Sequence, residues 1–186
     1  MVIRMRILYV HGAGGSEQSF NWIHKCLPEH TAVFFNYSVK ESISATINRL
    51  VPLIDRPTVL LGHSLGGIIT ATCAELPEVQ KLITLCAPFG GVPHAELLSM
   101  FSYESLFRDL CFHSPLLTAL RSKTILIPHL AIVANSGMPL LKEPNDGVLT
   151  VSSQTAIDMT YEMLPLNHFE VLLSMKVVEL ITDFLN

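Results

Sequence analysis

A serine turn between two apolar segments constrains the fold of this chain more than any other stretch. Residues 62–66 read Gly-His-Ser-Leu-Gly, with the apolar run 58–61 before them and the apolar run 68–74 after them. The first run has the length and composition of a buried strand, and the second has those of a helix. The two glycines let the backbone turn sharply enough to hold Ser64 in a strained conformation. The segment therefore predicts a strand, a tight turn and a helix.

The serine in this turn has two interpretations. Its hydroxyl can cap the helix that follows by accepting a hydrogen bond from a backbone N–H. Alternatively, the hydroxyl of Ser64 is presented at the carboxyl end of the strand, where the N–H of Leu65 faces an oxygen that becomes negative during a reaction. The buried strand before the turn and the apolar helix after it favour the second interpretation.

Strand and helix patterns alternate along most of the chain. Strands are expected at residues 5–10, 31–35, 58–61, 81–86, 129–134 and within 157–163, and helices between Ser16 and Pro28, at 43–54, at 68–74 and at 171–185. Pro52 is expected to stop or kink the second helix near its end. Such alternation predicts an α/β fold with about six mostly parallel strands and helices on both faces. The 186 residues suffice for a single domain over 1–186 with a sizeable core.

Composition excludes several classes of protein. Hydrophobic residues make up 49% of the chain, yet no apolar run reaches the roughly 20 residues that a membrane span requires. The net charge of −4 comes without a basic stripe, which argues against a nucleic-acid partner. The basic and apolar start at residues 1–10 is strand-length and leads into a glycine-rich loop, so we interpret it as folded and retained.

The cysteines indicate a reducing compartment. Cys26, Cys73, Cys86 and Cys111 lie far apart without a C-x-x-C pair, and most stand in apolar segments. This spacing predicts free, buried thiols rather than a disulfide framework or a zinc site, and a cytoplasmic location.

Polar and glycine-rich connections follow the expected strands. They lie at residues 11–15, 62–66, 87–91, 135–148 and 164–168. Because the carboxyl ends of parallel strands meet at one edge of the sheet, these loops should come together there, where such sheets bind ligands.

A serine hydroxyl is a weak nucleophile and needs a base, which in turn needs an orienting carboxylate. His168 and Asp146 occupy two of these loops downstream of Ser64, so they are the candidate base and acid. Glu143 is the alternative acid. The other histidines are expected to be surface or satisfied core groups rather than bases: His24, His30, His94, His113 and His129. His11 is expected to shape its own loop.

With these residues in place, the sequence resembles the α/β-hydrolases, and in size the small bacterial lipases and esterases that lack a large cap. Residues 11–15 match the oxyanion loop, 62–66 the nucleophile elbow, 145–148 the acid turn and 167–168 the base loop. Full-size members begin with extra antiparallel strands for which this chain is too short. The resemblance therefore implies a minimal α/β-hydrolase fold of six strands.

The resemblance also implies roles for individual residues. Ser64 would be the nucleophile, His168 the general base and then acid, and Asp146 the carboxylate that orients the base. The backbone amides of Ala13 and Leu65 would form the oxyanion hole. The implied reaction is hydrolysis of a carboxylic ester with an apolar acyl group, without a metal or cofactor.

Two questions stay open at the level of sequence. The segment 93–122 is expected to be a helical, apolar insertion divided by Pro115, which either covers the core or forms a short lid over an acyl chain. The same three side chains also suit a thioesterase, an amidase or an acyltransferase, and the fold can serve as a non-catalytic ligand-binding module.

Overall fold

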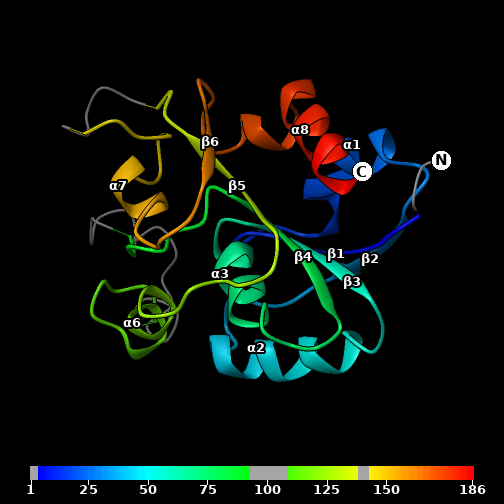
Figure 1. The fold of residues 1–186 in the computed structure, drawn as a ribbon. Helices are drawn as coiled ribbons and strands as arrows, with labels where there is room; N and C mark the ends of the chain where they lie inside the picture. The colour runs from blue at the N-terminus through cyan, green and yellow to red at the C-terminus, as the bar shows by residue number, and fades with distance from the viewer. Residues whose placement is uncertain (1–3, 93–108, 138–142) are drawn as a thin grey trace.

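The computed structural model describes residues 4–92, 109–137 and 143–186. Within them, six parallel strands form one sheet in the order β2-β1-β3-β4-β5-β6 (Figure 1). The strands are β1 (Arg6–Val10), β2 (Thr31–Phe35), β3 (Thr58–His63), β4 (Val79–Leu85), β5 (His129–Ala134) and β6 (Tyr161–Leu164). The order places β3, which carries the serine turn, at the centre of the sheet.

Helices cover both faces of this sheet. They are α1 (Asn21–Cys26), α2 (Ile43–Leu50), α3 (Leu65–Thr72), α6 (Pro115–Arg121), α7 (Val151–Gln154) and α8 (Met175–Leu185), with 3-10 turns at η1 (Glu17–Phe20), η2 (Val51–Leu53) and η3 (Glu170–Leu172). Figure 1 shows α1 and α8 together on one side of the sheet and α2 and α3 on the other. The predicted α/β architecture with helices on both faces is confirmed.

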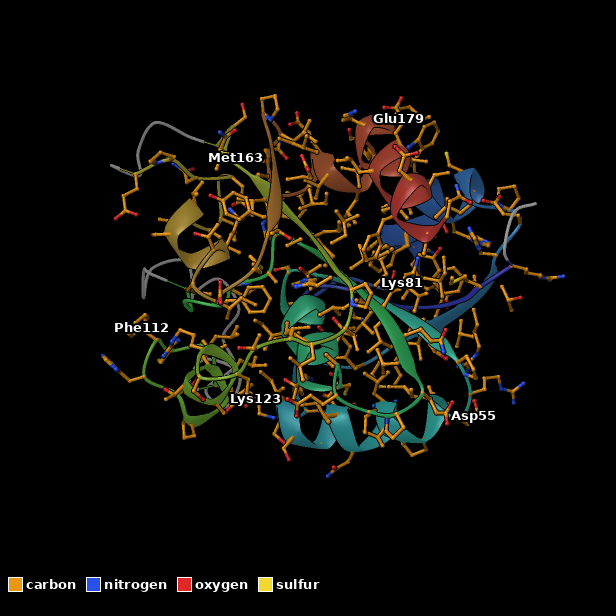
Figure 2. All side chains as sticks on the ribbon, viewed as in Figure 1. Asp55, Lys81, Phe112, Lys123, Met163 and Glu179 are labelled. Atoms are coloured by element: carbon orange, nitrogen blue, oxygen red, sulfur yellow. The ribbon has the colours of Figure 1, made fainter. Side chains whose placement is uncertain are left out.

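Alternation along the strands divides the core into two clusters. In β3, Leu60 packs into the cluster under α2 and α3, whereas Val59 and Leu61 pack into the cluster under α1 and α8. Successive side chains of a strand point to opposite faces, so a central strand covered on both faces must be apolar throughout. All six residues of β3 are accordingly buried. Side chains fill the space between the sheet and the helices on both sides (Figure 2).

Most expected elements occur where the sequence predicts them. The strands at 31–35 and 129–134 have the predicted bounds, and Ser16 caps η1 by accepting a hydrogen bond from the N–H of Gln18 (3.3 Å). The helix expected at 43–54 ends as an α-helix at Leu50 and continues as η2, because proline at position 52 cannot donate the helical hydrogen bond.

The short helix α7 was not predicted. It is only four residues long and has a single apolar residue, Val151, so its sequence carries no periodic signal. Its end is nonetheless specified by a distant contact: the amide of Gln154 accepts a hydrogen bond from the N–H of Ala134 (3.0 Å) and donates one to the carbonyl of the same residue (2.9 Å). This side chain pairs with the end of β5 as a neighbouring strand would.

Only part of the expected insertion at 93–122 can be described, since residues 93–108 lie outside the described ranges. In the remainder, Pro115 is the first residue of α6, and Ser114 caps the helix. Leu117 and Leu120 are buried in the cluster under α3, and Arg121 donates a hydrogen bond to the carbonyl of Phe89 (3.2 Å). This part of the segment covers the core.

The cysteine prediction is correct for two positions and wrong for another. Cys73 and Cys86 are buried free thiols, and Cys26 is half-buried. Cys111 is exposed, because it lies on the turn before α6 and not in a buried strand or helix.

In the described part of the chain, every helix falls short of the length and apolarity that crossing a bilayer would require.

The serine turn requires glycine at position 66 for a steric reason. A Cβ atom there would lie 2.0 Å from the carbonyl oxygen of Val10 and 2.6 Å from that of His11. Since both obstacles are backbone atoms, one in the last residue of β1 and one in the residue that follows it, the Gly66→Ala variant should lose roughly 3 kcal/mol or more of unfolding free energy. Urea denaturation followed by circular dichroism measures the change.

Gly14→Ala is the matched control for that variant. Gly14 has a φ of +71°, but of the described residues none comes within 4 Å of a Cβ placed there. Its substitution should cost only about 1 to 2 kcal/mol of backbone strain. Similar losses for the two variants would contradict the steric explanation.

Candidate active site

The turn after β3 holds Ser64 in an unusual backbone conformation. Its φ of 53° and ψ of −122° lie in a region that residues other than glycine rarely adopt. The N–H of Ser64 donates to the carbonyl of Leu85 in β4 (2.8 Å), and the carbonyl of Ser64 accepts from the N–H of Gly67 (2.8 Å). These bonds fix the turn between the sheet and α3.

Geometry decides between the two interpretations of this serine. Within the described helix α3, Ser64 occupies the N-cap position, yet its hydroxyl accepts no capping hydrogen bond from the helix. The side chain is partly exposed, although its neighbours in β3 and α3 are buried. The hydroxyl is therefore available for another role at the carboxyl edge of the sheet.

Asp146 lies in the connection between β5 and α7, where a local turn orients its carboxylate. The side-chain oxygen of Asn145 accepts a hydrogen bond from the N–H of Gly147 (2.9 Å), whose φ is +95°. Oδ1 of Asp146 accepts from the N–H groups of Val148 (2.9 Å) and Leu149 (2.6 Å). Two backbone donors thus stabilise a carboxylate that is only 1% exposed.

His168 lies in the loop after β6 and is hydrogen-bonded to Asp146 through its side chain and its backbone. Its Nδ1 lies 2.6 Å from Oδ2 of Asp146, and its N–H donates to the carbonyl of the same residue (2.8 Å). A carboxylate can only accept, so in the neutral ring the proton is on Nδ1 and Nε2 keeps its lone pair. His168 is 3% exposed.

The alternative acid has a different partner. Glu143 is exposed, and its Oε2 accepts a hydrogen bond from the hydroxyl of Ser152 (2.8 Å). The structure therefore brings Asp146, and not Glu143, to the imidazole of His168.

The loop at residues 11–15 passes directly against the serine turn. A Cβ on Gly12 would lie 3.1 Å from Cβ of Ser64. The N–H of Gly15 donates to the carbonyl of Gly12 (3.1 Å), and Gly14 between them has the positive φ of 71° that a type II turn requires. Ala13 stands in this turn, and Leu65, as the first residue of α3, has an N–H that points out of the helix.

Tyr37 supports this loop and was not singled out from the sequence. Its ring stacks on that of His11, with centroids 4.4 Å apart and planes 5° apart. Its hydroxyl donates to the carbonyl of His11 (2.9 Å), across 26 positions of the chain. Burial lowers the pKa of His11 from its ordinary value. The structure thus agrees with the expectation that His11 shapes its loop, and it shows that Tyr37 supports His11.

Cys86, at the end of β4, is a further neighbour that was not expected. Its Sγ lies within 4.8 Å of a carboxylate oxygen of Asp146 and a ring nitrogen of His168. Burial, together with the charge of Asp146 and a hydrogen bond to it, raises the pKa of this thiol, so the S–H persists as a donor. Like Ser64, Cys86 has a positive φ (49°), which no local sequence signal indicates.

Among the described residues, Cys86, Asp146 and His168 form the group that most resembles a set of metal ligands. Cys86, Asp146 and His168 offer a thiol, a carboxylate and an imidazole within 4.8 Å of one another. However, the thiol is protonated and the other two groups are bound to each other. The arrangement fits a hydrogen-bonded acid and base better than a ligand set for a cation.

No protein-family model matches the chain, and no curated protein matches it. Solved structures do match it in fold. A lipase-esterase related protein from Clostridium acetobutylicum is 18% identical with a TM-score of 0.68, over 96% of this chain and 93% of that one. The mature lipase BlEst2 of Bacillus licheniformis is 16% identical with a TM-score of 0.73, over 98% and 92%.

A third similar structure, a monoacylglycerol lipase from Paleococcus ferrophilus, is 13% identical with a TM-score of 0.73, over 97% of this chain and 93% of that one. Identities this low show likeness of fold alone. The six-stranded parallel sheet, the strained serine turn after β3 and these likenesses agree with one another. The chain accordingly has a minimal α/β-hydrolase fold, similar to those of lipases and esterases.

Proposed function

We propose that this protein is a serine hydrolase that cleaves carboxylic esters through an acyl-enzyme on Ser64. The observation that carries the proposal is the buried hydrogen bond between His168 and Asp146 (2.6 Å) at the sheet edge where β3 presents a strained serine. The names of the similar structures, lipases and a lipase-esterase related protein, add support for an ester as substrate.

In the proposed mechanism, Oγ of Ser64 attacks the ester carbonyl while Nε2 of His168 takes its proton. Asp146 stabilises the resulting imidazolium. The N–H groups of Ala13 and Leu65 hydrogen-bond the oxyanion of the tetrahedral intermediate. When the intermediate collapses, His168 returns the proton to the departing alcohol. Water, activated by the same imidazole, then attacks the acyl-enzyme, and His168 returns the proton to Oγ of Ser64 as the carboxylic acid leaves.

Exposed apolar side chains beside the base support an apolar acyl group. Phe169 is 64% exposed, and the centroid of its ring lies 5.3 Å from that of His168. Leu173, which follows the short η3 turn that begins after Phe169, is 67% exposed. An acyl chain that covered these side chains would remove apolar surface from water, which favours binding by about 25 cal/mol per Å².

A fluorophosphonate probe tests the proposal most directly. We expect it to label Ser64 in the folded protein, as mapped by peptide mass spectrometry, and to abolish turnover of p-nitrophenyl esters in proportion to labelling. A series of p-nitrophenyl esters of increasing acyl length then reports the acyl preference. Labelling restricted to the unfolded protein would instead favour a ligand-binding module.

The other reactions open to this triad are separated by the leaving group. Oxygen esters, thioesters and amides of matched acyl length share the acyl-enzyme and differ in the bond that is broken. We expect kcat/KM to be higher for the oxygen ester than for the thioester or the amide. A thioester or amide that reacts faster would replace the esterase assignment without changing the roles of the three residues.

A further inference from the structure

We infer that His63, the residue before the candidate nucleophile, is a positioning residue that fixes the backbone of His168 against the serine turn. The inference rests on the proposed function, because it concerns how the base of that reaction is held. His63 is the last residue of β3 and is 4% exposed. A polar side chain buried to this degree needs a partner, and the partner it has belongs to the base.

The contact is a hydrogen bond between the end of β3 and the loop that follows β6. Nε2 of His63 lies 2.9 Å from the carbonyl oxygen of His168, 105 positions further along the chain. The two imidazole rings are also in contact, with centroids 4.8 Å apart. A carbonyl can only accept, so the ring of His63 donates through Nε2–H.

This bond completes the support of His168. One carboxylate oxygen of Asp146 accepts a hydrogen bond from Nδ1 of His168 (2.6 Å). The backbone carbonyl of Asp146 accepts a second one from the backbone N–H of His168 (2.8 Å). His63 binds the backbone carbonyl on the other side. The N–H, the C=O and Nδ1 of His168 are therefore each held, which orients Nε2, the atom that must face the serine. Because His63 is joined to Ser64 by a peptide bond, it ties the base directly to the element that carries the nucleophile.

The ring of His63 also contacts the loop at residues 11–15. A Cβ on Gly12 would lie 3.0 Å from Nδ1 of His63 and 3.1 Å from Cβ of Ser64. The imidazole thus lies between the candidate oxyanion loop and the base loop. A side chain without its shape would allow both loops to shift relative to Ser64.

The protonation state of His63 suits this role. Burial and, to a smaller extent, the neighbouring His168 lower the pKa of His63 to about 3. The ring of His63 is therefore neutral near pH 7. A neutral ring keeps its one N–H for the carbonyl, and it adds no second positive charge next to the imidazolium that forms on His168 during the reaction.

Four variants test the inference. Phe at position 63 keeps a flat ring but cannot donate, Gln has an amide N–H that can reach the carbonyl of His168, and Asn is one methylene too short. The control is His129→Phe, which removes a ring at the beginning of β5 that hydrogen-bonds the side chain of Thr84 (2.9 Å) and has no assigned role in the reaction. Turnover of a p-nitrophenyl ester is measured per site that a fluorophosphonate labels, so that misfolded protein does not contribute.

We expect His63→Phe to lower kcat per labelled site by about 10- to 100-fold with little change in KM, since an ångström of misplacement costs about 100-fold. His63→Gln should stay within a few-fold of the original protein, and His63→Asn should resemble the Phe variant. His129→Phe should lower the thermal midpoint and leave kcat per labelled site unchanged.

The outcomes separate the inference from the proposed function. Absence of labelling and turnover in the unsubstituted protein would overturn the proposed function itself. Normal kcat per labelled site in His63→Phe and His63→Asn, whatever their thermal midpoints, would leave the proposed function intact and overturn the role of His63. Equal losses in the Gln and Asn variants would show that the hydrogen bond is not the cause. If the Phe variant does not fold, the Gln and Asn pair decides.

Discussion

Replacing Ser64 by alanine should lower ester turnover by a factor on the order of 10⁴ to 10⁶, the scale seen when a serine hydrolase loses its nucleophile. Without Oγ there is no atom to form the acyl-enzyme, and His168 has no serine hydroxyl to deprotonate. The fold should persist, because within the described part of the chain the Ser64 hydroxyl does not cap α3. Alanine also tolerates the positive φ about as well as serine.

The measurement is kcat/KM for a p-nitrophenyl ester, together with the thermal midpoint of each variant. Ser174→Ala is the matched control, because Ser174 is likewise an N-cap residue whose hydroxyl makes no capping bond to the described helix α8. It should retain full activity. If Ser64→Ala kept more than about a tenth of the turnover, Ser64 could not be the nucleophile, because the loss of a nucleophile lowers turnover by orders of magnitude.

Replacing Asp146 by asparagine should lower turnover by about 10⁴-fold with the fold preserved. The side-chain oxygen of asparagine can still accept the N–H groups of Val148 and Leu149, so the turn keeps its hydrogen bonds. The amide nitrogen then faces Nδ1 of His168 and donates to it. That reversal moves the ring proton to Nε2, where it blocks acceptance of the serine proton.

Glu143→Gln is the control for this variant. Glu143 binds Ser152 at the surface, so its substitution should leave kcat unchanged. Steady-state kinetics of both variants, with circular dichroism to verify folding, distinguish the two acids. Near-normal turnover in Asp146→Asn combined with a large loss in Glu143→Gln would transfer the orienting role to Glu143.

The bounds of β2 and β5 were predicted correctly, and these two strands show which features allow an element to be predicted from sequence. β2 and β5 are short apolar segments bounded by polar or proline residues, so their ends are marked locally. The helix α7 has no such marks: its four residues, three of them polar, are held by the contact of Gln154 with Ala134, which exists only once β5 is in place.

The same division applies to the candidate site. The two glycines around Ser64 act within five residues, and the positions of Asp146 and His168 after successive strands follow from the rule that parallel strands end at one edge. By contrast, His11 meets Tyr37 across 26 positions and His63 meets His168 across 105. Neither contact leaves a pattern in the residues next to it.

The amino-acid sequence by itself determined the alternation of strands and helices, the serine turn and the edge of the sheet at which the polar loops meet, because hydrophobic periodicity and glycine spacing act over a few residues. Only the tertiary structure decided that Asp146 rather than Glu143 binds the imidazole of His168, that Cys86 lies beside that pair, and that His63 hydrogen-bonds the backbone carbonyl of His168. The reason is physical: those contacts depend on strand order and on the paths of long connections, which the packing of the whole sheet fixes.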